Sequence, residues 1–258
     1  MLGRYHYDIA YISSVGNVRK VNQDSLIVRC GKIGDKEFSL LAVADGMGGL
    51  LHGEKASGTA IQLLDQWWNS RLAGCLSKGL DWEQLKNSMA VLIDQINWSL
   101  YSASEESKEK SGTTLTAAFL YQEQFCIFQV GDSRADKVTG RGLAQITKDQ
   151  TFVQQEVDAG RITHEEAKNH PMKHALLSAL GVTSEYVMEQ FPGKLDPGEG
   201  LLLCSDGFYQ EMGGTWYKDF GRSEQLQELL SGEERAICRG MASDNLTAIL
   251  VRLNKGKR

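Results

Sequence analysis

The sequence predicts an α+β sandwich in which mostly antiparallel sheets are covered by helices. Three observations indicate this class. Strand-like segments come first, two long amphipathic segments follow, and a block of hairpin-like strands then precedes one more helix and a last strand. This order lacks the regular alternation of strands and helices that is typical of a Rossmann fold.

The first half of the chain supplies three strands and two helices. Apolar segments at 5–15, 25–30 and 37–44 read as strands, and we expect the third to end at an Asp45-Gly46 turn. A helix is predicted over 53–73, where Ala60, Leu64 and Trp67 fall on one stripe. A second helix is predicted over 82–107, with Asp81 as its N-cap.

The second half begins with a predicted hairpin, 113–121 and 124–131, and one or two further strands within 134–147. The segment 149–180 is polar and helical and contains a Thr163-x-x-Glu166 capping box, so it reads as an inserted lobe. The prediction ends with strands at 185–192 and 199–204, a helix at 223–240 and a strand at 245–253.

Composition limits the organisation and the partners of the chain. With 258 residues, 41% of them hydrophobic, and only three prolines, a single domain over residues 1–258 and a monomer are the simplest expectations. A net charge of −5 argues against a nucleic-acid partner, because phosphate contacts require a basic face. The sequence contains no long apolar segment of the kind that would predict a membrane span or a signal peptide. Five scattered cysteines without a CxxC pair predict a reduced, cytoplasmic protein with small buried thiols.

Acidic residues follow apolar strands at several places in the chain: Asp45, Asp132, Asp206 and Asp244, with Asp24 as a fifth candidate. Any one of them is explained by a common Asp-Gly or Asp-Ser turn. If the strands pack in one sandwich, however, the carboxylates can meet at one end, where their pKa values would rise unless a cation neutralises them. Oxygen-rich sites of this kind suit Mg²⁺ or Mn²⁺.

Glycine follows the first of these acids in "ADGMGG", residues 44–49. A glycine at position 46 would let the backbone carbonyl turn toward a metal, and Gly48 and Gly49 would lead into the next helix; a plain strand-to-helix turn is the alternative. The histidines of the polar lobe, His164, His170 and His174, lack matched cysteines at zinc spacing and are expected to be surface residues or caps.

Six motifs then occur in order over about residues 8–252: VGNVRKVNQD (15–24), VADGMGG (43–49), SGTTLTAAFL (111–120), VGDSRA (130–135), LLLCSDG (201–207) and SDNLTAILV (243–251). In this order and spacing they resemble the bacterial metal-dependent protein serine/threonine phosphatases of the protein phosphatase 2C-like (PPM) family. The resemblance implies a four-layer αββα sandwich with a centre for two Mn²⁺ or Mg²⁺ ions at one end. It also implies that the lobe at about 148–180 is the family's flap, which borders the substrate groove.

The resemblance also implies roles for individual residues. Asp45 is similar to the carboxylate that bridges both metals, and Gly46 to the residue whose carbonyl binds one of them. Asp206 and Asp244 resemble ligands of the other metal, and Asp132 a ligand of a third, weaker metal. Arg19 resembles the phosphate-binding arginine, whose fork suits a phosphate, and Gln23 and Asp24 resemble residues that hold metal-bound waters.

The chemistry implied by these parts is hydrolysis of phosphoserine or phosphothreonine. Two cations would polarise the phosphate and acidify a water for in-line attack, with Arg19 neutralising the developing charge. Cys204 lies in an apolar strand and is expected to pack in the core rather than attack. The resemblance implies phosphorylated proteins as substrates and a cognate Ser/Thr kinase as a partner.

The chain departs from the family pattern at a few positions. Met47 stands where some relatives have a histidine proposed as general acid, and we do not assign that role to the displaced His52. Gln210 and Lys173 replace an Asp and an Arg that are frequent in relatives. A pseudophosphatase that binds phosphoproteins without hydrolysis is the alternative, although the intact acids argue against it. A nucleotide-binding enzyme is a weaker alternative, because the sequence lacks GxGxxG and GxxxxGK[ST] motifs.

Overall fold

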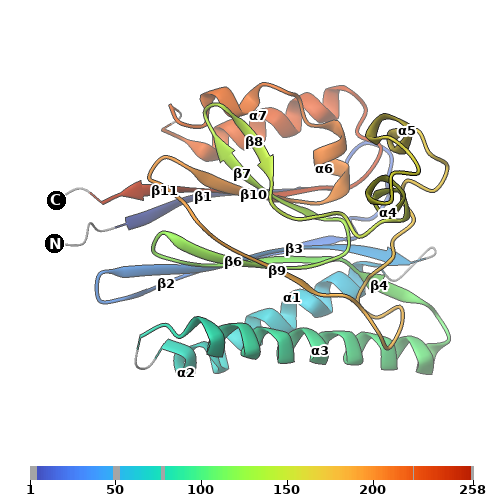
Figure 1. Cartoon of the computed structure of the whole chain (residues 1–258), viewed down its shortest axis with the longest axis horizontal. Coiled ribbons are helices and arrows are strands. Elements are labelled where there is room, and N and C mark those ends of the chain that lie inside the picture. Colours follow the sequence, from blue (N-terminus) through green and yellow to red (C-terminus); the bar gives the residue numbers. More distant parts are fainter. Residues whose placement is uncertain (1–4, 49–52, 77–78, 223, 257–258) are drawn as a thin grey trace.

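The computed structural model describes residues 5–48, 53–76, 79–222 and 224–256. Two antiparallel sheets lie face to face, and helices cover the outer face of each, so that the molecule has the four αββα layers that the sequence predicts (Figure 1). Both chain ends lie at one edge of the sandwich, and the polar lobe lies at the opposite edge.

The first sheet joins strands from the beginning, the middle and the end of the chain. Its order is β1 (Tyr5–Ser14), β11 (Leu246–Lys255), β10 (Gly200–Cys204), β7 (Arg134–Thr139) and β8 (Gly142–Gln145). The last strand, β11, therefore lies between β1 and β10, and it pairs with β1 along the whole length of both strands.

The second sheet has the order β2 (Asp24–Ile33), β3 (Lys36–Gly48), β5 (Leu115–Tyr121), β6 (Gln124–Val130) and β9 (Glu189–Lys194). The short strand β4 (Ser111–Thr113) pairs with the end of β3. Along β3, alternate side chains enter different cores: Leu40 and Ala42 pack toward helices, whereas Leu41 and Val43 pack between the sheets. Burial on both faces explains why this strand is continuously apolar from Leu40 to Ala44.

Helices complete the outer layers. The second sheet is covered by α1 (Gly53–Ser70), α2 (Leu72–Leu76) and α3 (Trp82–Ser107). The first is covered by α6 (Asp206–Glu211), a 3₁₀ turn (Trp216–Asp219) and α7 (Leu226–Arg239). The lobe carries α4 (Phe152–Asp158) and α5 (His164–Lys168). We call residues 148–180 the flap.

Most elements agree with the sequence prediction, including the bounds of α3, the Asp81 N-cap, the hairpin and the Thr163–Glu166 capping box. Several expectations were wrong. The strand β3 does not end in a turn at Asp45-Gly46 but continues to Gly48, because β4 pairs with it. The first helix ends at Ser70, β9 begins only at Glu189, and α7 begins only at Leu226. Cys30 is exposed and Cys238 half-buried, although buried thiols were predicted.

Two other sequence expectations concern the cysteines and the membrane. All five cysteines are free, and Cys204 is fully buried in the core as predicted. Of the helices in the described part of the chain, none is both long and apolar enough to cross a bilayer.

Candidate functional site

The predicted acidic residues meet at the edge of the sandwich next to the flap, although they come from different elements of both sheets. Asp24 begins β2 and Asp45 lies in β3, whereas Asp132 follows β6. Asp206 is the first residue of α6, and Asp244 precedes β11. All four other carboxylates act on Asp45 electrostatically and raise its pKa, which means that the five groups are neighbours.

Asp24 and Asp45 are directly opposite each other in the antiparallel β2–β3 pair. Like charges in this position destabilise a sheet, so the arrangement is unfavourable unless something else compensates it. One compensation comes from the other sheet, because the hydroxyl of Ser205 donates a hydrogen bond of 2.7 Å to Oδ2 of Asp24. This bond joins the two sheets at the site.

Asp206 accepts a hydrogen bond from the helix that it begins and lies close to the flap. The amide of Gln210, one turn further along α6, donates to Oδ2 of Asp206 over 3.1 Å. Nδ1 of the flap residue His174 lies 3.6 Å from the same oxygen, and its side chain is exposed as the sequence predicts. The helix α6 itself was not predicted, because Asp206-Gly207 reads as a turn in the sequence.

Arg19 lies in the loop between β1 and β2 and faces the carboxylates. Its Nη2 donates to Oδ2 of Asp244 over 2.7 Å, and this bond, together with the charges of Asp244, Asp45 and Asp206, raises the pKa of the guanidinium. Arg19 is therefore a cation at the rim of an acidic site, with half of its side chain exposed to solvent.

Asn245 fixes the Arg19 loop in place. This buried side chain accepts a hydrogen bond from the backbone N–H of Gln23 (2.9 Å) and donates to the carbonyls of Val15 (3.0 Å) and Val21 (3.1 Å). Asn245 lies within the SDNLTAILV motif, but no role for it was predicted from the sequence. The signal that could have found it is its place between an acid and a strand, where asparagine often bonds to backbone.

The backbone of Asp45 is fixed by two threonines, whose role was likewise not predicted from the sequence. The hydroxyl of Thr114 accepts from the N–H of Asp45 (3.0 Å), and the hydroxyl of Thr113 donates to its carbonyl (3.0 Å). Both threonines are buried. The main chain of Asp45 therefore has a single position, independent of what its carboxylate binds.

Gly46 is required by close packing. A Cβ at this position would lie 2.1 Å from the carbonyl oxygen of Gly53 and 2.5 Å from that of Gln23. The glycine thus lets β3 pass close to the start of α1 and to the Arg19 loop. Gly49 and His52 lie outside the described residues.

Burial and mutual repulsion raise the pKa of the acidic side chains. For Asp132 burial is the main cause, followed by the charge of Asp206, and the pKa is about 8. For Asp24 burial raises the pKa to about 6, although the hydroxyl of Ser205 opposes this. Burial and the charge of Asp244 likewise raise the pKa of Asp206. The fully ionised cluster is therefore unstable by itself and favours binding of a cation.

The donor set fits a hard divalent cation. Carboxylate oxygens are the ligands that Mg²⁺ and Mn²⁺ prefer. Within the described residues, no three Asp, Glu, His or Cys side chains are grouped tightly enough to hold a metal ion alone. Water or backbone carbonyls would have to complete the coordination, which suits Mg²⁺ because it retains several waters in proteins.

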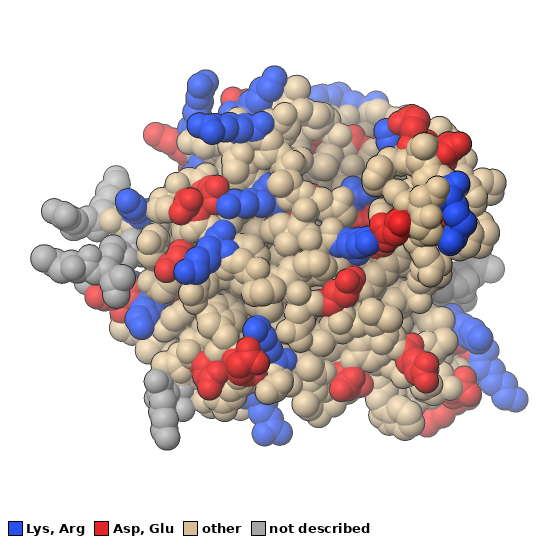
Figure 2. Space-filling model, in the orientation of Figure 1, with Lys and Arg blue, Asp and Glu red and all other residues tan. Residues whose placement is uncertain are grey.

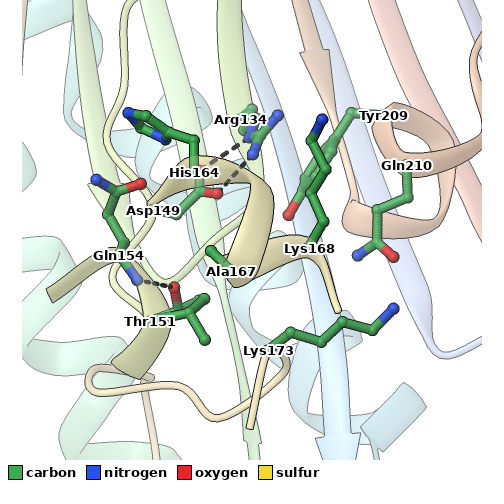
Figure 3. A pocket seen from close by; sticks show the side chains of 11 residues that line it. Arg134, Asp149, Thr151, Gln154, His164, Ala167, Lys168, Lys173, Tyr209 and Gln210 are labelled. Atoms are coloured by element: carbon green, nitrogen blue, oxygen red, sulfur yellow. Dashed lines mark hydrogen bonds and ion pairs between the residues drawn. The ribbon is translucent and has the colours of Figure 1, made fainter. Parts of the chain in front are cut away.

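A pocket of about 470 Å³ opens beside the acidic cluster, between the flap and α6 (Figure 3). Residues of β7, of the flap and of α6 line it, among them Arg134, Lys168, Lys173 and Gln210. Nε and Nη2 of Arg134 donate to the two carboxylate oxygens of Asp149, over 2.9 and 2.6 Å. We call this cavity the flap pocket.

Comparison with known proteins gives consistent matches over nearly the whole chain. The family model described as protein phosphatase 2C matches residues 17–250. The serine/threonine phosphatase stp of Listeria monocytogenes serotype 4b is 33% identical over 242 residues, which are 92% of each chain. The structure of an S. agalactiae serine/threonine phosphatase matches with a TM-score of 0.86 and 25% identity, covering 96% of this chain and 99% of that one. The catalytic domain of the serine/threonine protein phosphatase PstP, solved with two manganese ions, matches with a TM-score of 0.78 and 30% identity over 97% of this chain and 100% of that one.

Proposed function

The chain belongs to the protein phosphatase 2C family and is an enzyme of the serine/threonine phosphatase class, and from this premise we propose that it hydrolyses phosphoserine and phosphothreonine in proteins by direct attack of water. The observation that carries the proposal is the meeting of five buried or half-buried aspartates, beside the cationic Arg19, at one edge of the sandwich. Cys204 is not expected to form a cysteinyl-phosphate intermediate, because its thiol is buried and its pKa is raised by that burial.

We propose that Asp45, Asp206 and Asp244, with the carbonyl of Gly46, hold two divalent cations, and that Asp132 contributes to a weaker third position. When bound, Mn²⁺ or Mg²⁺ would supply Lewis acidity for the phosphoryl group and lower the pKa of water. The PstP structure with two manganese ions supports the number of ions and favours manganese.

The remaining residues of the site would bind and orient. Arg19 is free to turn from Asp244 to the phosphoryl oxygens, because its side chain is half exposed, and it would stabilise the charge that develops there. Asp24 and Gln23 would orient waters around the cations. Asp24 is buried and fixed by Ser205, as such a role requires.

We further propose that the enzyme acts on phosphorylated proteins in the cytoplasm as a monomer and reverses the action of a Ser/Thr kinase. Support for the substrate class comes from the names of the relatives. Native mass, and phosphoproteomics after deletion of the gene, are the direct measurements.

The test is release of phosphate from p-nitrophenyl phosphate and from a phosphothreonine peptide with and without Mn²⁺. Wild-type protein is expected to turn over both substrates only with the metal. Asp45→Asn and Asp206→Asn are each expected to lose at least about 100-fold in kcat, because each removes a charge from the cation site. A folded wild-type protein that binds Mn²⁺ but releases no phosphate would instead be a phosphoprotein-binding pseudophosphatase.

A further inference from the structure

The flap pocket has no part in the reaction proposed above, yet its lining differs from the rest of the surface. Over the face in Figure 2, acidic and basic side chains are interspersed without a large patch of one sign. In the flap pocket, by contrast, Arg134, Lys168 and Lys173 meet a single acidic residue, Asp149. His164, Gln154 and Gln210 add polar groups to the walls.

The Arg134–Asp149 pair is the fixed wall of the pocket and is neutral as a unit. Besides its two hydrogen bonds to Asp149, the guanidinium lies 3.7 Å above the ring centre of Tyr209. The amide of Gln145 also donates to Asp149 over 2.9 Å. Asp149 is thus fully engaged and does not neutralise the lysines of the pocket.

Those lysines supply the excess positive charge. Lys168 contacts Glu165 over 2.7 Å, but both side chains are about 70% exposed or more, so that this ion pair is weak. Lys173 forms no ion pair with any described residue, whereas the flap acids Glu156 and Asp158 are paired with Arg161 and Lys148. In Figure 3 the side chain of Lys173 extends along the rim of the pocket to the side where Gln210 lies.

Gln210 connects the flap pocket with the candidate metal site. Its side chain lines the pocket and at the same time donates to Asp206. On the other side, His174 follows Lys173 in the chain and lies 3.6 Å from Asp206. Because Gln210 touches both sites and an extended peptide advances about 3.3 Å per residue, a substrate with its phosphate at the acidic cluster can place a side chain a few residues away in the pocket.

We propose that the flap pocket binds an aspartate or glutamate side chain of the substrate near its phosphorylated serine or threonine, so that the enzyme selects phosphorylation sites with an acidic neighbour. This inference rests on the proposed function and specifies the substrate class. Lys173 is the main contact for this carboxylate, and Lys168 adds to the positive electrostatic potential of the pocket. Binding of the neighbouring carboxylate positions the peptide and does not take part in the hydrolysis.

The experiment compares phosphothreonine peptides in which one Glu is placed in turn at each flanking position, each against its Gln counterpart. Wild-type enzyme with Mn²⁺ is expected to show a kcat/KM about twofold to fivefold higher for Glu at one position, the range of a partly exposed ion pair. Lys173→Ala is expected to reduce this ratio to about one. Lys173→Glu is expected to reverse it, so that Lys at this position is preferred to Glu.

The matched control is Lys148→Ala, which removes the same charge from another exposed flap lysine that does not line the pocket. It is expected to retain the wild-type ratio. The ratio is also expected to fall between about 0.05 and 0.5 M salt, because screening weakens exposed charge pairs.

The outcomes separate the two proposals. A wild-type enzyme that releases no phosphate from any peptide or from p-nitrophenyl phosphate overturns the proposed function. An active enzyme without a Glu preference, or one whose preference survives Lys173→Glu, overturns the role of the flap pocket and leaves the phosphatase intact.

Discussion

Asn245→Ala tests whether the Arg19 loop is held by a single buried side chain. Asn245 is 4% exposed and makes three hydrogen bonds to backbone groups of residues 15–23. Alanine keeps the Cβ but leaves one N–H and two carbonyls without their partner. At about 1 kcal/mol for each net hydrogen bond, the loss in free energy of unfolding is about 3 kcal/mol.

Two measurements follow from this estimate. In a protein of this length, 3 kcal/mol lowers Tm by about 6–12 °C, which a thermal unfolding curve resolves easily. Because Arg19 also loses its fixed position, kcat/KM for a phosphopeptide is expected to fall about 10- to 100-fold, as is common when a binding group is displaced by about 1 Å.

The control is Asn254→Ala, near the other end of the same strand. Asn254 donates one hydrogen bond of 2.7 Å to Asp8 and is remote from the acidic cluster. Its loss is expected to cost about 1 kcal/mol and to leave kcat/KM unchanged. If Asn245→Ala lowers Tm no more than Asn254→Ala and keeps full activity, Asn245 does not anchor the loop.

Three further results are expected. Burial and the charge of Asp206 raise the pKa of Asp132 from about 4 to about 8, so the metal-free protein should lose stability as the pH rises between these two values. Mn²⁺ should therefore raise Tm more at a pH of about 8.5 than at about 5.5. An equal increase in Tm at both pH values would contradict this. Gly46→Ala should lower the free energy of unfolding by more than about 3 kcal/mol, whereas Gly140→Ala, with open space at its Cβ, should change it by less than about 0.5 kcal/mol; equal denaturant midpoints would refute the close packing. A thiol-reactive reagent should label Cys30 in the native protein and Cys204 only on unfolding, and equal labelling rates would show that the buried core opens.

Local sequence signals predicted the fold well where the structure is decided locally. The helix α3 begins and ends where its apolar stripe and the Asp81 cap indicate, since these signals act within a few residues. The prediction of a turn at Asp45-Gly46 was wrong because the structure there depends on residues that are distant in the sequence. This segment remains in a strand because Asp24 of β2 pairs with Asp45, and Gly112 and Thr113 of β4 pair with the residues that follow it; no local pattern reports such pairing.

For the site, the sequence identified the groups that carry charge but not those that hold them. The recurring strand-then-Asp pattern led to Asp45, Asp132 and Asp206, which the structure brings together. Asn245 and Ser205 were missed, because their importance depends on hydrogen bonds to segments distant in sequence. The excess of lysine in the flap pocket was equally invisible, since it depends on which flap charges are paired with each other.

The bond between Ser205 and Asp24 spans 181 residues, and the strand after Asp244 lies in the interior of the first sheet, between β1 and β10. The acidic cluster therefore cannot assemble until β11 has been synthesised and inserted. Contacts of such long sequence separation form late in folding. A truncated chain that lacks the last strand is consequently expected to have no phosphatase activity, because its acidic cluster is incomplete.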